Sequence, residues 1–354
     1  MAKVEGAEIK LSDLVQGVKG GQIDWGKQMM YASGEGVAPP KSEVPNRARA
    51  YLKAKDYARM AAIANLLMVI EGTTISYEGY GKDFMAKDVT LRQTIEGYVK
   101  NVEILRSERT SSGNDTTVKV WVGTRIYGDQ TPGTAFLGKL ADTEKPKQPP
   151  LIEIPLEKSS PRPSTPTKLA AAEVDGQGVA SYAGPAASRP EDPEAMAALG
   201  KQEGPFTSLI VDARGYNVPQ AICPKIRKLN GDQVYGSLLA KTDPAIRDGI
   251  VSYTRTPDAA RESDRCGGNP FVVGAIGRGG GRSMCDVIVA DGTAKQIVAE
   301  NSAGKFLDQY KVIFVVDPPS SALSSSMTKA EPKPSEVRVA LSDTAHVAKK
   351  KGAK

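Results

Sequence analysis

Histidine is almost absent from this chain of 354 residues, which contains a single one, His346. Ser-His-Asp and Cys-His sites, and metal centres rich in histidine, need that residue buried beside a nucleophile or an ion. His346 stands in a basic stretch near the end of the sequence, where the composition cannot bury it. Histidine-based catalysis and a histidine-rich metal site are therefore not expected, and the sequence assigns no catalytic residue, metal or cofactor.

Cysteine is also scarce, and the three cysteines form neither a disulfide framework nor a CxxC pair. Two interpretations stay open. One is a disulfide between Cys266 and Cys285 in an exported protein, although the two residues flank a predicted hairpin without lying opposite each other on it. The alternative is that these two residues and Cys223 are partly buried thiols.

Long apolar runs are missing. No stretch of about 20 apolar residues occurs, so no membrane span is predicted. The first residues, MAKVEGAEIKLSDLVQG, lack the apolar core of a secretory signal. The protein is therefore either cytoplasmic or a periplasmic or outer-membrane-associated form whose leader was removed.

The chain has a net charge of +6 and a pI of about 9.0, and most of the excess positive charge lies in the tail. Residues 318–354 hold seven Lys and Arg against three acids, which accounts for +4 of the net charge. The folded parts are then close to neutral, so nucleic acid is not expected as a partner. The tail is suited to contact with an anionic surface.

Low-complexity segments divide the chain. Residues 141–204 are rich in Pro, Ser, Ala and Gly and are expected to be a disordered linker, in which 151–156 (LIEIPL) is a candidate edge strand. Residues 1–21 are expected to be a flexible arm, and 318–354 a basic tail. The length and the 40% hydrophobic content fit two small domains.

The first block, residues 22–140, is predicted to be α+β. Its main element is an alanine-rich helix at 45–71 that ends at Gly72, with an apolar stripe that includes Leu52, Ile63 and Leu66. Alanine-lined helices pack close to a sheet. The other expected elements are a helix at 82–97 and strands at 25–33, 73–77, 99–108 and 116–127, with a GEGVAPP turn after the first strand.

The second block, residues 205–317, is predicted to be a small α+β domain as well. One helix at 292–301 has Asp291 as a candidate N-cap. The expected strands are 208–213, 221–229, 233–236, 249–254, 270–276, 285–290 and 311–317. Both domains are expected to contain a mostly antiparallel sheet with one or two packed helices.

The stretch GRGGGR at 277–282 is the strongest candidate ligand or interface segment. Its backbone could hold an anion between two arginines, but no helix follows and the pattern is not a P-loop. A flexible hairpin tip is the favoured interpretation. The candidate residues are Arg278, Gly279, Gly280, Gly281 and Arg282.

Carboxylates occur singly along the chain, without the defined pairs that glycosidase chemistry needs. Asp212 follows a strand, and its favoured role is to cap a turn with Arg214 as ion partner. Asp286 begins another strand. Trp25 is expected to lie in the core or in an interface.

With these residues in view, the first block resembles the family of envelope lipoproteins and flagellar assembly proteins represented by FlgP and the amino-terminal region of FlgT. The similar pieces are IDW at 23–25, ASGEG at 32–36, the alanine helix, Gly72 and the closing strands. The second block resembles the carboxy-terminal extension of longer relatives, through SLIVDARG at 208–215, VYGS at 234–237 and GNP at 268–270.

The resemblance implies a non-enzymatic envelope protein that forms rings or similar homo-oligomers and contacts other envelope or flagellar proteins in the periplasm or at the outer membrane. The first cysteine is Cys223, so lipid anchoring is not expected of the chain as written. Two alternatives stay open. One is a module that binds an anionic cell-wall polymer, lipid headgroup or nucleic acid through the Gly/Arg loop and the tail. The other is an enzyme that works through Asp212 or Asp286.

Overall fold

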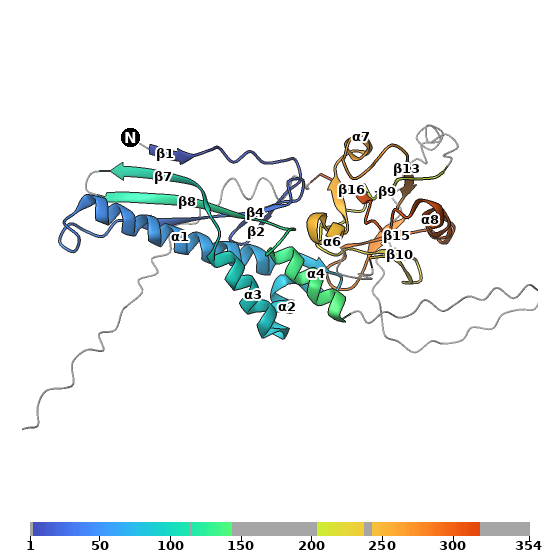
Figure 1. The fold of residues 1–354 in the computed structure, drawn as a ribbon, viewed down its shortest axis with the longest axis horizontal. Helices are drawn as coiled ribbons and strands as arrows, with labels where there is room; N and C mark the ends of the chain where they lie inside the picture. Colours follow the sequence, from blue (N-terminus) through green and yellow to red (C-terminus); the bar gives the residue numbers. More distant parts are fainter. Residues whose placement is uncertain (1–2, 113–114, 144–203, 237–242, 319–354) are drawn as a thin grey trace, which may run out of the picture. The chain divides into compact units, whose positions relative to one another are not determined.

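The structure is a computed structural model that describes residues 3–112, 115–143, 204–236 and 243–318. It has mixed α+β architecture, with an antiparallel sheet and helices in the first domain and further sheets in the second (Figure 1). Both domains belong to one compact unit that ends at Pro318. The strand predicted at 151–156, most of the predicted linker, the basic tail and His346 lie outside the described residues.

The first domain is built on a six-stranded sheet in the order β1-β7-β8-β4-β3-β2, and every neighbouring pair is antiparallel. Its strands are β1 (Lys3–Gly6), β2 (Val15–Val18), β3 (Gly21–Asp24), β4 (Met29–Val37), β7 (Ile104–Ser112) and β8 (Asp115–Arg125).

The prediction of a flexible arm at residues 1–21 is wrong, because this segment supplies both edges of the sheet. Strand β1 pairs with β7, more than 100 residues later, and β2 forms a hairpin with β3. The GEGVAPP turn is also a misassignment. Its first residues continue β4 as far as Val37, because each of them pairs with β8.

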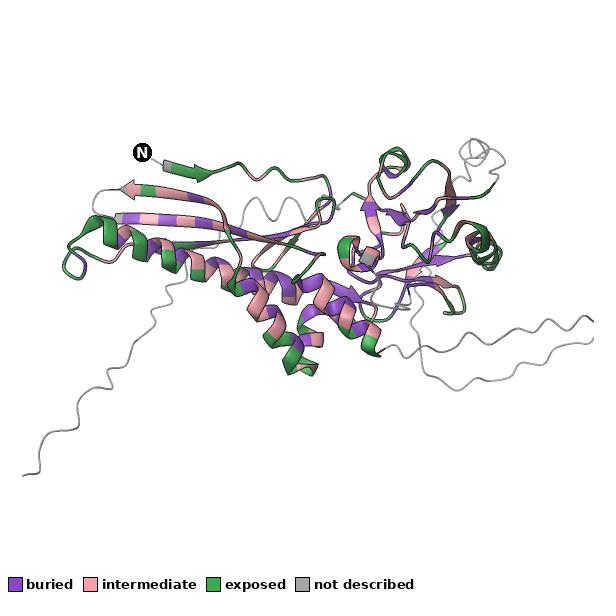
Figure 2. Ribbon diagram, viewed as in Figure 1, coloured by how far each residue is buried: buried purple, intermediate pink, exposed green. Residues whose placement is uncertain are grey.

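The long helix α1 (Arg47–Gly72) confirms the predicted alanine helix. Asn46 caps its start by accepting a hydrogen bond from the Arg49 N–H at 3.1 Å. The apolar stripe was only partly predicted, since Leu52 is 57% exposed. Figure 2 shows the buried stripe of α1 on the side toward the sheet; it consists of Ala50, Ala54, Ala58, Ala62, Leu66, Val69 and Ile70.

Two glycines of β4 let α1 approach the sheet closely. A Cβ atom added to Gly34 would lie 2.2 Å from the backbone nitrogen of Ala62, and one added to Gly36 would lie 2.2 Å from the carbonyl oxygen of Ala54. No side chain fits between the two backbones at these positions. The expectation that the alanine helix packs close to a sheet is therefore confirmed.

Two helices replace the single one predicted at 82–97: α2 (Gly81–Lys87) and α3 (Val89–Lys100). Asp88 separates them and caps α3, where its Oδ1 accepts the Leu91 N–H at 3.0 Å. A further helix, α4 (Pro132–Thr143), was not predicted, although it buries Phe136, Leu137 and Leu140. Its last turn extends into the predicted linker.

The second domain departs from the expected antiparallel arrangement. Its strands β12 (Ser252–Thr254), β16 (Val312–Val315), β9 (Ser208–Asp212) and β13 (Pro270–Gly274) form a four-stranded sheet in that order, and all three pairings are parallel. Strand β9 is buried on both faces, which is typical of parallel sheets. Since parallel neighbours are joined by long crossovers, local sequence patterns could not reveal the pairing.

The other sheet of the second domain is mixed and has the order β11-β10-β15-β14, in which β10 and β15 are parallel. Its strands are β11 (Gln233–Tyr235), β10 (Ile226–Lys228), β15 (Asp286–Val289) and β14 (Gly277–Gly279). The helices are α6 (Asp243–Asp248), α7 (Pro257–Arg261) and α8 (Asp291–Gly304). Asp291 is the first residue of α8 and not its N-cap, which is Ala290.

Candidate functional site

The Gly/Arg loop at 277–282 is not a flexible hairpin tip. Its first residues form β14, which pairs with β15. Arg278 donates from Nη1 to the carbonyl oxygen of Asn217, and the Arg282 N–H donates to the carbonyl oxygen of Tyr77 at 3.2 Å. The Arg282 guanidinium lies 3.9 Å from Asp83. The two arginines thus contact different parts of the chain.

The glycines of this loop are required by its backbone conformation and by close packing. Gly280 and Gly281 adopt positive φ angles of +94° and +53°. A Cβ atom on Gly280 would lie 2.4 Å from Oδ2 of Asp286, and one on Gly281 would lie 2.5 Å from the carbonyl oxygen of Tyr77. Close packing therefore explains the glycine pattern without a ligand.

The partner of the loop is a short hairpin of the first domain, β5 (Thr74–Ser76) and β6 (Gly79–Tyr80), with Tyr77 in its turn. The Tyr77 ring centroid lies 5.2 Å from Nζ of Lys225 and 4.8 Å from Cζ of Arg227. The second domain also donates backbone hydrogen bonds from Ile222 and Cys223 to the strand β5, at 3.1 and 2.7 Å. This hairpin is therefore held by main-chain bonds and by two cations.

Asp286 is a buried structural carboxylate. Its Oδ2 accepts from Nε of Arg227 at 2.6 Å, and its Oδ1 accepts the Lys225 N–H at 3.0 Å. Burial raises the pKa of Asp286, while the hydrogen bond and charge of Arg227 oppose the shift. A fully buried, paired carboxylate is suited to joining β10 to β15.

Asp212 and Arg214 have the geometry that the sequence predicts for a capped turn. Oδ1 of Asp212 accepts the Arg214 N–H at 3.1 Å, and its two oxygens accept from Nε and Nη2 of Arg214 at 2.9 and 2.7 Å. Asp212 raises the pKa of Arg214 through this pairing. Asp212 ends β9, whereas Asp286 lies in the other sheet, so the two candidate carboxylates are on different sheets.

The same turn has a second carboxylate that sequence reasoning missed. Asp317 follows β16 and accepts the backbone N–H groups of Gly215 and Asn217, each at 2.7 Å. Since β9 and β16 are parallel neighbours, their carboxyl ends meet at one edge. The pairing of these strands was the signal needed to find it.

Trp25 lies in the core, as expected, and is 4% exposed. Its Nε1 donates to Oε1 of Gln16 at 2.8 Å. Its ring packs edge-on against Tyr253 of the second domain, with centroids 5.6 Å apart. Trp25, in the turn after β3, therefore packs against strand β12 of the second domain.

The disulfide that the sequence left open between Cys266 and Cys285 is absent, and all three cysteines are free and buried. Cys266 belongs to a core cluster with Ile210, Ala260 and Ile313 that does not include Cys285. Burial raises the pKa of the Cys285 thiol. The alternative interpretation, buried thiols, is the one that the structure has.

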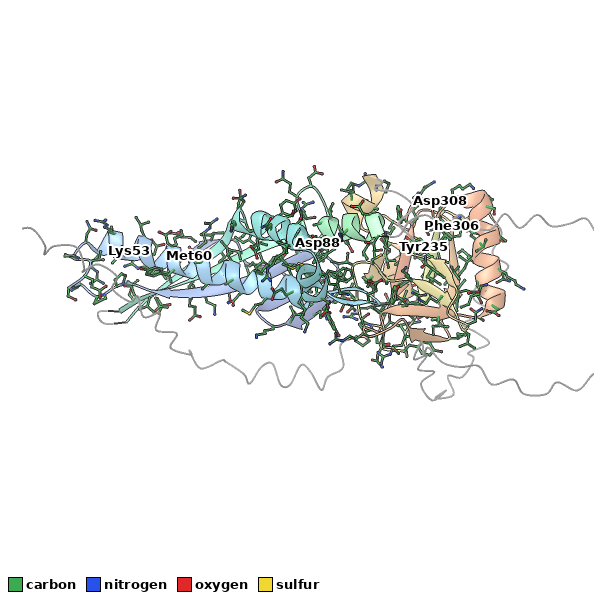
Figure 3. The ribbon with its side chains drawn as sticks, turned by 90° about the horizontal axis from the view of Figure 1, so that it is seen from below. Lys53, Met60, Asp88, Tyr235, Phe306 and Asp308 are labelled. Carbon is green, nitrogen blue, oxygen red and sulfur yellow. The ribbon has the colours of Figure 1, made fainter. Side chains whose placement is uncertain are left out.

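Asp88, the residue before α3, forms a partly exposed ion pair with Lys139 of α4. Nζ of Lys139 lies 2.5 Å from Oδ2 of Asp88, which is labelled in Figure 3. The hydrogen bond from Lys139 lowers the pKa of Asp88. Among the described residues, no group of three or more His, Cys, Asp or Glu side chains is arranged to hold a metal ion. No helix in that part of the chain is long and apolar enough to cross a membrane.

The edges of the six-stranded sheet form a candidate interface that the sequence interpretation assigned to a flexible arm. Within the described part of the chain, β1 pairs only with β7, and β2 pairs only with β3. On β1, Val4 is 48% exposed, and Glu5 and Gly6 are exposed as well. Gly17 is exposed on β2. Both edges can therefore be reached by another extended strand.

A cavity of about 840 Å³ is a second candidate site. It lies at the amino ends of β12 and β16, opposite to the edge that holds Asp212. Its lining includes Gln28 from the turn before β4, together with Ser252, Glu262, Arg265 and Lys311 of the second domain. A volume of this size is in the range of small-molecule pockets.

A family model matches the second domain. The family described as Treponema pallidum Tp0624, second domain, matches residues 208–318. No curated protein matches the chain. The matched range begins with β9 and ends just after β16, so it covers the whole described sheet structure of this domain. The resemblance of the first domain to FlgP and FlgT stays a prediction.

Proposed function

We propose that this chain is a non-enzymatic structural or assembly protein of the bacterial cell envelope, and that copies of it join through the two edges of the six-stranded sheet. The observation that carries the proposal is the pair of accessible edge strands, β1 and β2. The family match to a domain of a bacterial protein supports the bacterial origin. The placement in the periplasm or at the outer membrane, beside flagellar or other envelope proteins, rests on the resemblance of the first domain.

The direction of the edge strands favours a head-to-tail contact. Each of the successive pairings from β1 to β2 is antiparallel, and there is an odd number of them, so β1 and β2 run in opposite directions. The β1 edge of one copy therefore meets the β2 edge of the next copy as an antiparallel neighbour. Such a contact keeps α1 on the same face of the sheet in every copy. Repeated contacts of this type close into a ring or continue as a filament.

The strength of this contact is limited by the length of the edges. Two strands of four residues offer on the order of four hydrogen bonds, each with a net value of about 1 kcal/mol. The total of about 4 kcal/mol corresponds to a dissociation constant of about 1 mM. Self-association is therefore expected to depend on protein concentration, and a stable ring needs additional contacts.

Cysteine cross-linking tests the proposal directly. We expect a bismaleimide to link the double variant Val4→Cys/Gly17→Cys into a ladder of multimers. A mixture of the two single variants should give dimers only, because each copy then has one reactive edge. The buried native thiols leave the background low. Val298→Cys, on the exposed face of α8, is the matched control and should remain monomeric.

Two outcomes would contradict the proposal in different ways. Dimers of the Val4→Cys single variant alone would indicate a symmetric β1–β1 contact and would refute the head-to-tail geometry. A constant monomer mass in light scattering up to millimolar concentration, without cross-linked multimers, would refute self-association altogether.

The alternative function, binding of an anionic polymer or headgroup, has less support from the described residues. Arg278 and the backbone of the Gly/Arg loop are engaged in contacts within the chain. Arg282 keeps an exposed side chain, and the basic tail lies outside the described residues. Alanine at Arg278 and Arg282 should reduce the salt dependence of binding if this alternative holds.

A further inference from the structure

Arg265 is a cation without a carboxylate partner in the described part of the chain. Its Nη1 donates to the carbonyl oxygens of Tyr310 at 2.8 Å and Gly249 at 3.2 Å, and its Nη2 donates to that of Asp248. The Nε–H and the second N–H of Nη2 have no acceptor among the described residues. Carbonyl oxygens orient the guanidinium but do not neutralise its charge.

The cavity that Arg265 lines contains two further donors. The hydroxyl oxygen of Ser252 is buried and has no hydrogen-bond partner in the described structure. A buried hydroxyl without a partner costs free energy, so a site of this kind calls for a group that supplies one. Lys311, immediately before β16, also lines the cavity and takes part in none of the ion pairs of the described residues.

Two of the three acidic residues that line the cavity are more exposed than these donors. Glu262 and Asp264 are exposed, so water screens their charges. Asp248 is already paired with Arg247, whose Nη2 lies 2.8 Å from its carboxylate. Arg265, in contrast, is partly buried, and desolvation lowers its pKa. Arg265 and Lys311 therefore lie deeper than Glu262 and Asp264, and Asp248 is the one partly buried acid of the lining whose charge acts on Arg265.

We propose that this cavity binds the oxyanion group, a carboxylate or a phosphate, of a small molecule. Its oxygens accept hydrogen bonds from the free N–H groups of Arg265 and from the Ser252 hydroxyl, and Lys311 supplies a second positive charge. The cavity volume of about 840 Å³ leaves room for a body larger than the anionic group. The site is independent of the sheet edges, so it does not rest on the proposed self-association.

Thermal unfolding in the presence of simple anions tests the site. The probes are inorganic phosphate and, in a second arm, acetate, each compared with chloride at the same ionic strength. Binding to the native state alone raises the midpoint temperature as the anion concentration increases. We expect phosphate, acetate or both to exceed chloride. The more effective anion identifies the chemical class of the ligand.

Three variants separate the site from a general salt effect. Lys311→Met should weaken the apparent affinity by about fivefold or more, since a charged contact of about 1 kcal/mol or more is lost. Lys295→Met removes an equal charge from the exposed side of α8 and should leave the affinity unchanged. Ser252→Ala should raise the midpoint temperature without anion, because it removes an unpaired hydroxyl, and should reduce the shift that the anion produces.

The outcomes that overturn the proposal are specific. If chloride stabilises the protein as much as phosphate and acetate do, the cavity has no oxyanion site. If Lys311→Met and Lys295→Met change the affinity equally, the effect belongs to the general charge of the protein. If Ser252→Ala raises the midpoint and leaves the anion shift intact, the hydroxyl is not part of the site.

Discussion

A methyl group added to Gly34 should separate α1 from the sheet that it covers. In the variant Gly34→Ala, the new Cβ atom would lie 2.2 Å from the backbone nitrogen of Ala62 and 2.4 Å from the carbonyl oxygen of Ala58. Ordinary contact begins near 3.4 Å, so the helix must move by about 1 Å. Both neighbours are backbone atoms and cannot rotate away.

The expected cost follows from this geometry. Overpacking of a tight interior costs about 1–3 kcal/mol, and the backbone clash places this variant near 3 kcal/mol. Replacing glycine also restricts the unfolded chain, which offsets about 0.5–1 kcal/mol. The net loss is about 2 kcal/mol, or about 4–8 °C in the midpoint temperature for a unit of this size. Urea unfolding followed by circular dichroism measures the loss.

Gly97→Ala is the matched control, because it makes the same chemical change where nothing lies within 4 Å of the new atom. Gly97 is inside α3, so alanine should stabilise the protein by about 0.5–1 kcal/mol. The two variants should thus have opposite signs. If Gly34→Ala is as stable as the unmodified protein while Gly97→Ala gains stability, α1 does not pack on β4 at the distance described.

Three further predictions concern the second domain and its contacts. Tyr77→Ala should lower the free energy of unfolding by about 2 kcal/mol, because a ring that contacts two cations is lost. Tyr57→Ala, on the exposed face of α1, is the control and should change this free energy little. Urea titration of both variants measures the difference. As the pH falls through the raised pKa of Asp286 toward the ordinary value of 3.8, the native state takes up a proton before the unfolded state does. The free energy of unfolding of the unmodified protein should therefore rise relative to that of Asp286→Asn over this pH range. Parallel curves of the unfolding free energy against pH for the two proteins would contradict this. Maleimide should label none of the three thiols of the native protein and all three in denaturant; they are Cys223, Cys266 and Cys285. A single labelled thiol in denaturant would instead indicate a disulfide between the other two cysteines.

The elements with local signals were the ones that could be predicted. Helix α1 was expected at 45–71 and runs over Arg47–Gly72, because its helix formers and its end signal are adjacent in sequence. The side of the helix that is buried was harder to predict. Leu52 was expected in the apolar stripe and is exposed, because the close approach of β4 accepts alanine and leaves larger side chains outside.

A second large apolar side chain of α1 also lies outside the core: Met60, which is labelled near Lys53 in Figure 3. Met60 is 57% exposed, although hydropathy alone would place it inside. Hydrophobicity predicts that a side chain prefers burial, but the space next to the sheet decides which side chain is buried. Prediction from periodicity therefore found the helix and misplaced part of its face.

The candidate sites also include parts that local sequence predicts and parts that depend on distant contacts. The turn of Asp212 and Arg214 was predictable, because its partners are two residues apart. The partner role of Asp317 in that turn was not, since it depends on the parallel pairing of β9 with β16. The Gly/Arg loop was predicted to be a flexible hairpin tip, since its contacts with Tyr77 join residues about 200 positions apart and leave no local signal.

Composition and local pattern were enough to establish the α+β class, the helix α1 and the division into two sheet-containing domains, because propensities, caps and turns act between near neighbours. The strand pairings that place β1 and β2 at the edges and make the second domain's sheet parallel come from contacts between distant segments. The same holds for the cavity around Arg265, whose lining joins residues from both domains. Such contacts depend on how complementary surfaces pack once the elements exist, and no local stretch of sequence encodes them.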